Sequence, residues 1–171
     1  MKRDQTAKRV AFCAVFSALS VALMWLSVLI PTLDLTLAAF AAIPVYIALL
    51  DFSPGAGVSV YLVAGILALL LIPEKSVAVF FLALFGWYPF LRNAVSKFNL
   101  WIGCLIKLFC GIIGVGIAYL VLSFVFPDPE LLGHLTILVL ILIPVVLLLY
   151  DYALGRLILF YISQIRPKLH R

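Results

Sequence analysis

The chain has 171 residues, of which 67% are apolar and only 11% are charged. A soluble domain carries about a quarter charged residues, so this composition excludes an ordinary soluble fold. The net charge of +5 does not indicate nucleic-acid binding, because the basic residues flank apolar segments instead of forming one patch. Long apolar runs without alternation favour helices over a β-barrel, so we expect an all-α polytopic membrane protein.

Apolar segments follow one another along the whole chain, separated by short stretches that contain proline, glycine or charged residues. Pro44 falls inside the short second segment, which is expected either to extend into the preceding loop or to kink at this proline, and Pro144 is expected to kink the last segment. The last segment is longer than a bilayer requires, so its final turns are expected to emerge as an amphipathic tail. We predict one transmembrane domain over residues 1–171, with six helices in one bundle at residues 10–30, 37–50, 56–72, 77–91, 100–126 and 131–165.

The first segment follows a basic N-terminal stretch and carries a stripe of alanines. These alanines recur every three or four residues and so share one face of the helix. In lipid, helices associate where small side chains let their backbones approach. By spacing alone, packing within the chain's own bundle is the more common use of such a stripe, and docking on another protein is the alternative. The stripe consists of Ala7, Ala11, Ala14, Ala18 and Ala22.

The distribution of lysine and arginine predicts the orientation. With six spans, both termini lie on the same side of the membrane. Basic residues cluster in residues 2–9, in the connector at 92–99 and in the tail at 156–171. The loops on the other side carry Lys75 and several acidic residues. Cytoplasmic loops are the ones enriched in basic residues, so both termini are predicted to be cytoplasmic. The acidic residues are Asp34, Glu74, Asp128 and Glu130.

Charged residues at membrane depth are candidate functional groups. Lys107 lies on the glycine-rich face of the fifth segment, and Asp151 is expected at a similar depth in the sixth. We predict a Lys107–Asp151 ion pair, for which Arg92 or Arg156 could substitute. The pair is either a structural contact near the cytoplasmic interface, where a lysine can also snorkel to water, or a coupling or proton-relay pair.

Polar and aromatic residues at the outer ends of the segments predict a ligand site. Asp34, Phe80, Tyr119 and His134 are expected to line a cavity that opens outward and suits a small solute. The alternative is that they are ordinary solvated residues of short loops.

Catalytic and cofactor sites are not predicted. Gly57–Val58–Ser59–Val60 fits the GxSx pattern of intramembrane serine proteases, but Ser59 and His134 are expected at opposite membrane faces, too far apart to act together. The three cysteines lack metal-ligand spacing, and no nucleotide-binding motif is present. We therefore expect a protein that is not an enzyme and has no cofactor or metal of its own.

The alanine pattern carries a family resemblance. AVFSA at residues 14–18 and ALSVA at residues 18–22 form overlapping AxxxA motifs on the first of six helices. This architecture resembles the substrate-binding S components of energy-coupling factor (ECF) transporters. The stretches PTLDLT, PEKS, GWYP and YDYALGRL are similar to those of small bacterial S-component-like membrane proteins of unknown substrate.

The resemblance implies a function and partners. Ala14, Ala18 and Ala22 would dock a transmembrane coupling subunit that two ATPase subunits drive. The protein would lie in the bacterial cytoplasmic membrane and bind a vitamin or similar micronutrient in a pocket open to the outside. A second candidate is a structural scaffold, similar to the rod-shape-determining membrane protein D family, which binds cell-wall machinery and needs no solute pocket.

Overall fold

The computed structural model describes residues 2–30, 33–73, 75–95, 100–125, 146, 149–161 and 163. All regular elements within these ranges are helical, which confirms the all-helical fold for this part of the chain. The chain divides into two compact units, Met1–Pro127 and Asp128–Arg171. In the second unit, residues 149–160 form an α-helix.

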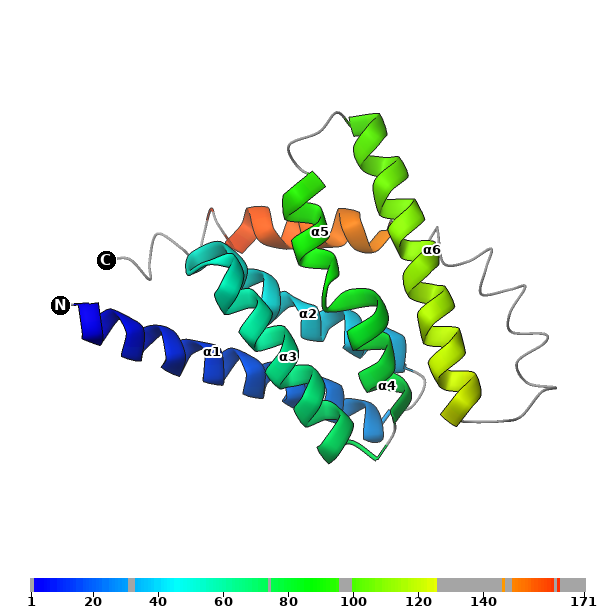
Figure 1. The fold of residues 1–171 in the computed structure, drawn as a ribbon, viewed down its shortest axis with the longest axis horizontal. Coiled ribbons are helices and arrows are strands. Elements are labelled where there is room, and N and C mark those ends of the chain that lie inside the picture. Colours follow the sequence, from blue (N-terminus) through cyan, green and yellow to red (C-terminus); the bar gives the residue numbers. More distant parts are fainter. Residues whose placement is uncertain are drawn as a thin grey trace. The chain divides into compact units, whose positions relative to one another are not determined.

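The described residues of the first unit form six α-helices and two short irregular turns, and Figure 1 shows their arrangement. A 3-10 turn, η1, follows α1, and a π-helical turn, η3, joins α4 to a bend before α5. The elements are α1 Lys2–Trp25, η1 Leu26–Val28, α2 Asp34–Asp51, α3 Pro54–Leu71, α4 Lys75–Phe80, η3 Phe81–Phe85, α5 Tyr88–Val95 and α6 Leu100–Val125.

Among the described residues, four helical segments are long and apolar enough to cross a membrane. They coincide with the first four predicted segments, although the fourth passes through η3 and a bend at Gly86 and Trp87. α2 continues on both sides of Pro44. The fifth predicted segment coincides with α6, whereas Pro144 and most of the sixth lie outside the described residues. The six-span bundle and its orientation therefore stay predictions. The four segments are Thr6–Val28, Asp34–Asp51, Pro54–Leu71 and Lys75–Val95.

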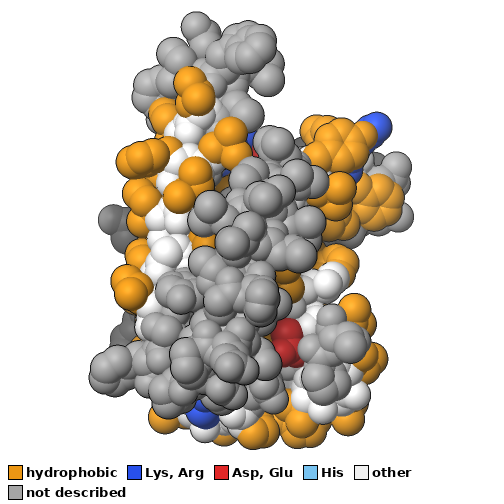
Figure 2. Space-filling view, turned by 90° about the vertical axis from the view of Figure 1, so that its right-hand side faces the viewer, with side chains coloured by type: hydrophobic (Ala, Val, Ile, Leu, Met, Phe, Trp, Pro, Cys, Tyr) orange, Lys and Arg blue, Asp and Glu red, His pale blue; other side chains and the backbone are white. Residues whose placement is uncertain are grey.

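Small side chains fill the contacts between α1, α2 and α3, which lie side by side (Figure 1). Alanines of α2 and α3 are fully buried there, including Ala41 and Ala64. Many large apolar side chains are exposed, and the exposed fraction is 74% for Leu70 and 67% for Leu105, although Phe81 and Phe85 are buried. Figure 2 shows one face of the molecule, on which most described side chains are hydrophobic. This arrangement, with small residues between helices and large apolar residues outside, suits a lipid environment.

Contacts between neighbouring elements define two ends of the first unit. At one end, Arg9 of α1 donates a hydrogen bond to the Ser53 hydroxyl, which precedes α3. A Cβ added to Gly57 would lie 3.1 Å from the Phe90 ring, so the first turn of α5 lies near the start of α3. We call this the basic end, because Lys8, Arg9 and Arg92 lie there. The opposite end, where α2 begins, is the Asp34 end.

Candidate functional site

The alanine stripe of α1 is exposed along its whole length. Ala14, Ala18 and Ala22, predicted to dock a partner, are exposed, and so are Ala7 and Ala11. The structure therefore keeps the stripe accessible on the surface of the described chain. The docking role itself stays a prediction.

A different face of α1 makes its internal contacts. Ser17, Ser20, Met24 and Ser27 are buried and follow one another at intervals of three and four residues. At about 100° per residue, this serine face lies roughly 130° around the helix from the alanine stripe. The Ser20 hydroxyl donates a buried hydrogen bond of 2.9 Å to the carbonyl oxygen of Ala41 in α2. The Ser20 hydroxyl thus bonds α1 to α2, whereas the Ser17 and Ser27 hydroxyls donate to the nearby carbonyl oxygens of Cys13 and Met24.

The predicted ligand residues are only partly described. Asp34 is half-buried at the start of α2, and its carboxylate accepts a hydrogen bond of 3.2 Å from Ser76 of α4. Phe80 lies one turn beyond Ser76 on α4 and is also half-buried. Asp34 and Phe80 therefore belong to adjoining elements at the Asp34 end. The side chain of Tyr119 and the whole of His134 lie outside the described residues, as do Glu74, Asp128 and Glu130.

Lys75, the basic residue of the predicted outer loops, contacts the end of α3. Its ammonium group donates to the carbonyl oxygens of Leu69 and Ile72, at 2.6 and 2.7 Å. These carbonyls lie at the C-terminal end of α3, where the helix has unpaired acceptors and a partial negative charge. Lys75 therefore caps α3.

The predicted ion pair stays a prediction. Lys107 is half-buried in α6 of the first unit, whereas Asp151 is half-buried in the helix of the second unit.

The GxSx serine is bonded within its own helix. The Ser59 hydroxyl donates to the carbonyl oxygen of Gly55 at 2.9 Å, which is the ordinary local bond of a serine in a helix. Within the described ranges, no group of three or more His, Cys, Asp or Glu residues could hold a metal ion.

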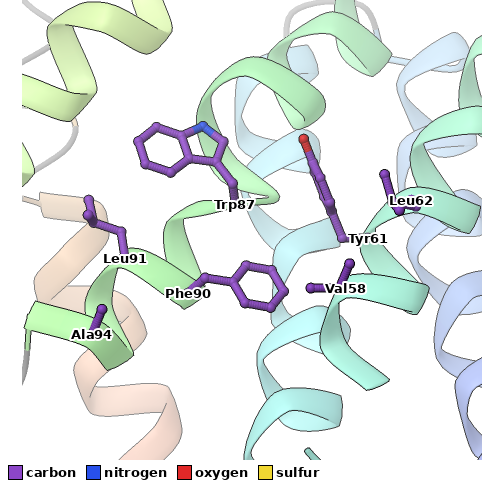
Figure 3. A pocket seen from close by; sticks show the side chains of 7 residues that line it. All are labelled: Val58, Tyr61, Leu62, Trp87, Phe90, Leu91 and Ala94. Carbon is purple, nitrogen blue, oxygen red and sulfur yellow. The ribbon is translucent and has the colours of Figure 1, made fainter. Parts of the chain in front are cut away.

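An apolar groove lies between α3 and α5 and was not predicted from the sequence (Figure 3). It has a volume of about 450 Å³ and is open to the surface. None of its side chains is charged. The lining residues are Val58, Tyr61, Leu62, Trp87, Phe90, Leu91 and Ala94.

The polar atoms of the two largest lining residues are bonded to the backbone of η3. The Tyr61 hydroxyl donates to the carbonyl oxygen of Leu82 at 2.9 Å, and Trp87 Nε1 donates to that of Ala83 at 2.6 Å. The groove is thus left with aromatic and aliphatic surface.

Two glycines allow α3 to pack closely against η3 and the bend that follows it, because a side chain at either position would overlap with its neighbour. A Cβ on Gly65 would lie 2.3 Å from Leu82 Cδ2, and a Cβ on Gly86 would lie 2.5 Å from the Tyr61 ring. Gly86 N donates to the carbonyl oxygen of Phe81 at 2.7 Å, which closes the wider π turn. The GWYP stretch at residues 86–89 contributes Trp87 to this groove, but in the sequence it suggested only a family resemblance.

Comparison with known proteins found no match among protein families, curated proteins or solved structures.

Proposed function

We propose that the chain is a multi-pass protein of a bacterial cytoplasmic membrane, with the basic end of the first unit on the cytoplasmic side. Four helices of sufficient length and hydropathy support the membrane location. The large exposed apolar side chains of α3 and α6 support it too, because lipid is the solvent in which they are favourable. The cations Lys8, Arg9 and Arg92 at one end support the orientation.

Within this setting, the chain acts as the solute-binding subunit of an ECF-type importer for a vitamin or similar micronutrient. The observation that carries this proposal is the exposed alanine stripe of α1. A stripe of small side chains that takes no part in internal packing is a surface on which a second membrane helix can approach closely. A transmembrane coupling subunit would dock there, and separate ATPase subunits would hydrolyse ATP.

The solute would enter from the Asp34 end, which the proposed orientation puts outside the cell. The Asp34–Ser76 hydrogen bond brings two polar side chains to the junction of α2 and α4, and Phe80 follows on α4. Small-molecule sites combine apolar walls with a few polar groups of this kind. Tyr119 and His134 complete the site in this proposal.

The docking proposal is tested with bulky substitutions on the stripe. The double variant Ala14→Trp with Ala18→Trp is coexpressed with a coupling subunit and its ATPases and purified through an affinity tag. Two indole rings would keep the helices apart, so recovery of the complex should fall at least tenfold while the isolated subunit stays folded. Leu19→Trp is the matched control, because Leu19 is 48% exposed on α1 but lies off the stripe. Copurification of the double variant at the control level would refute docking through the alanines.

Native mass spectrometry of the purified protein separates transport from the scaffold alternative. A small molecule bound at one per subunit, and lost in Asp34→Asn, supports solute binding at the Asp34 end. A protein that carries no small molecule but binds cell-wall or cell-shape factors would support a scaffold.

A further inference from the structure

We propose that the groove between α3 and α5 binds one acyl chain of an anionic phospholipid, whose phosphate is bound by Arg9 at the basic end. This inference goes beyond solute transport and rests on the proposed membrane location only.

The chemistry of the groove suits a hydrocarbon chain. Tyr61 and Trp87 direct their polar atoms to the carbonyls of Leu82 and Ala83, so they present ring faces to the groove. A polar solute entering such a groove would lose hydrogen bonds to water without replacement, at a cost of several kcal/mol in an apolar site. A saturated or unsaturated acyl chain has no such groups to satisfy.

The groove is accessible from the side, where lipid would be. Val58 and Leu62 line it and belong to the exposed face of α3, which continues through Ile66, 56% exposed. Both sides of the groove lie in segments able to span a membrane, Pro54–Leu71 and Lys75–Val95. A lipid beside α3 could therefore place a chain in the groove without leaving the bilayer.

A cation lies near the basic end of the groove. Arg9 Nη2 lies 3.4 Å from the position that a Cβ on Gly55 would take. Gly55 precedes Val58 by about one helical turn, a rise of roughly 4.5 Å, and shares the exposed face of α3 with Leu62. A guanidinium has five N–H donors, so its hydrogen bond to Ser53 leaves donors for a phosphate.

The volume favours a chain over a docking helix. One turn of an α-helix, about 10 Å across and 5.4 Å long, occupies roughly 420 Å³. The groove holds about 450 Å³, hence about a single turn, whereas packed membrane helices meet over several turns. A flexible acyl chain can instead adapt its conformation to a groove of this volume.

The experiment uses Trp87 as a reporter in the full-length chain. Trp25→Phe and Trp101→Phe leave Trp87 as the sole tryptophan, and the protein is reconstituted into phosphatidylcholine bilayers. Phosphatidylglycerol or phosphatidylcholine brominated in mid-chain is then added at low mole fraction, and quenching of Trp87 is measured. We expect brominated phosphatidylglycerol to quench at a mole fraction about fivefold lower than brominated phosphatidylcholine, the factor that one cation near an anionic lipid contributes.

Three variants identify the groups responsible. Arg9→Gln should remove the preference for phosphatidylglycerol, and Lys8→Gln, the neighbouring cation, should keep it. Ala94→Leu fills the groove and should weaken quenching by both lipids. Equal quenching by the two lipids in the parent protein would overturn the proposal, as would quenching by neither. Failure of the chain to enter the bilayer at all would contradict the proposed membrane location. Docking of a coupling subunit is tested separately, by the variants of the alanine stripe.

Discussion

Replacing Gly114 by alanine should push α6 away from η3. A Cβ on Gly114 would lie 2.6 Å from the carbonyl oxygen of Ala83 and 3.2 Å from Leu84 Cδ2. The nearer atom belongs to the backbone, so rotation of a side chain cannot relieve the overlap. The same carbonyl accepts the hydrogen bond of Trp87 Nε1, and its displacement would disturb the indole as well.

The expected magnitude follows from this geometry. The Ala83 carbonyl would have to move by about 0.8 Å to reach the 3.4 Å at which ordinary contact begins. Overpacking of this kind costs about 1–3 kcal/mol. Alanine also favours the helix over glycine by about 1 kcal/mol, so the net loss of stability for Gly114→Ala is smaller than the overpacking cost.

Gly116→Ala supplies the matched control, because no atom of the described residues lies within 4 Å of a Cβ at that position of the same helix. It receives the same gain in helix propensity without the overlap. Unfolding of both variants in mixed detergent, followed by tryptophan fluorescence, should place Gly114→Ala about 1–3 kcal/mol below Gly116→Ala. The Trp87 emission should shift in the folded Gly114 variant alone. Equal stability of the two variants would refute the close approach of α6 to η3.

Two further outcomes are expected. Ser20→Ala removes the buried hydrogen bond to Ala41 and should lower the free energy of unfolding in detergent by about 0.6 kcal/mol, the average for such bonds between membrane helices. The control Ser59→Ala loses only a bond within its own helix, on an exposed face, and should lower it by less. The reverse order would contradict the serine face as the contact surface of α1. The orientation can be tested with single cysteines in a cysteine-free background. Pro73→Cys at the Asp34 end should react with a membrane-impermeant maleimide on intact cells, whereas Asn93→Cys at the basic end should react only after lysis. The opposite pattern would reverse the proposed orientation.

The positions of the helices could be predicted because their causes are local. Apolar runs define α1, α2 and α3, and the residues that end one helix and begin the next lie directly beside these runs in the sequence. Ser53 and Pro54 show this directly, since the Ser53 hydroxyl accepts a hydrogen bond of 3.3 Å from Ala56 N at the start of α3. Neither the bend at GWYP nor the π turn before it was predicted, since the fourth segment was expected to run through residues 77–91.

The exposure of the alanine stripe could not be decided from spacing. Alanines and serines both recur on α1 at helical intervals, and either face satisfies the pattern of a packed membrane helix. Which face of α1 is buried depends on the Ala41 carbonyl of α2, which accepts a hydrogen bond of 2.9 Å from the Ser20 hydroxyl. That acceptor is supplied by another helix, so no property of α1 alone identifies the buried face.

The sequence by itself determined the all-helical class and the concentration of cations at one set of helix ends. It also predicted six spanning segments, and among the described residues the structure has four helical segments long and apolar enough to cross a membrane. These follow from composition and periodicity, which act over one helix at a time. Only the tertiary structure decided which face of α1 is exposed, and only it revealed the groove beside Tyr61 and Trp87. The groove depends on the close approach of Gly65 to Leu82 and of Gly86 to Tyr61. Such contacts join residues far apart in the chain, and it is the packing of whole helices that brings them together.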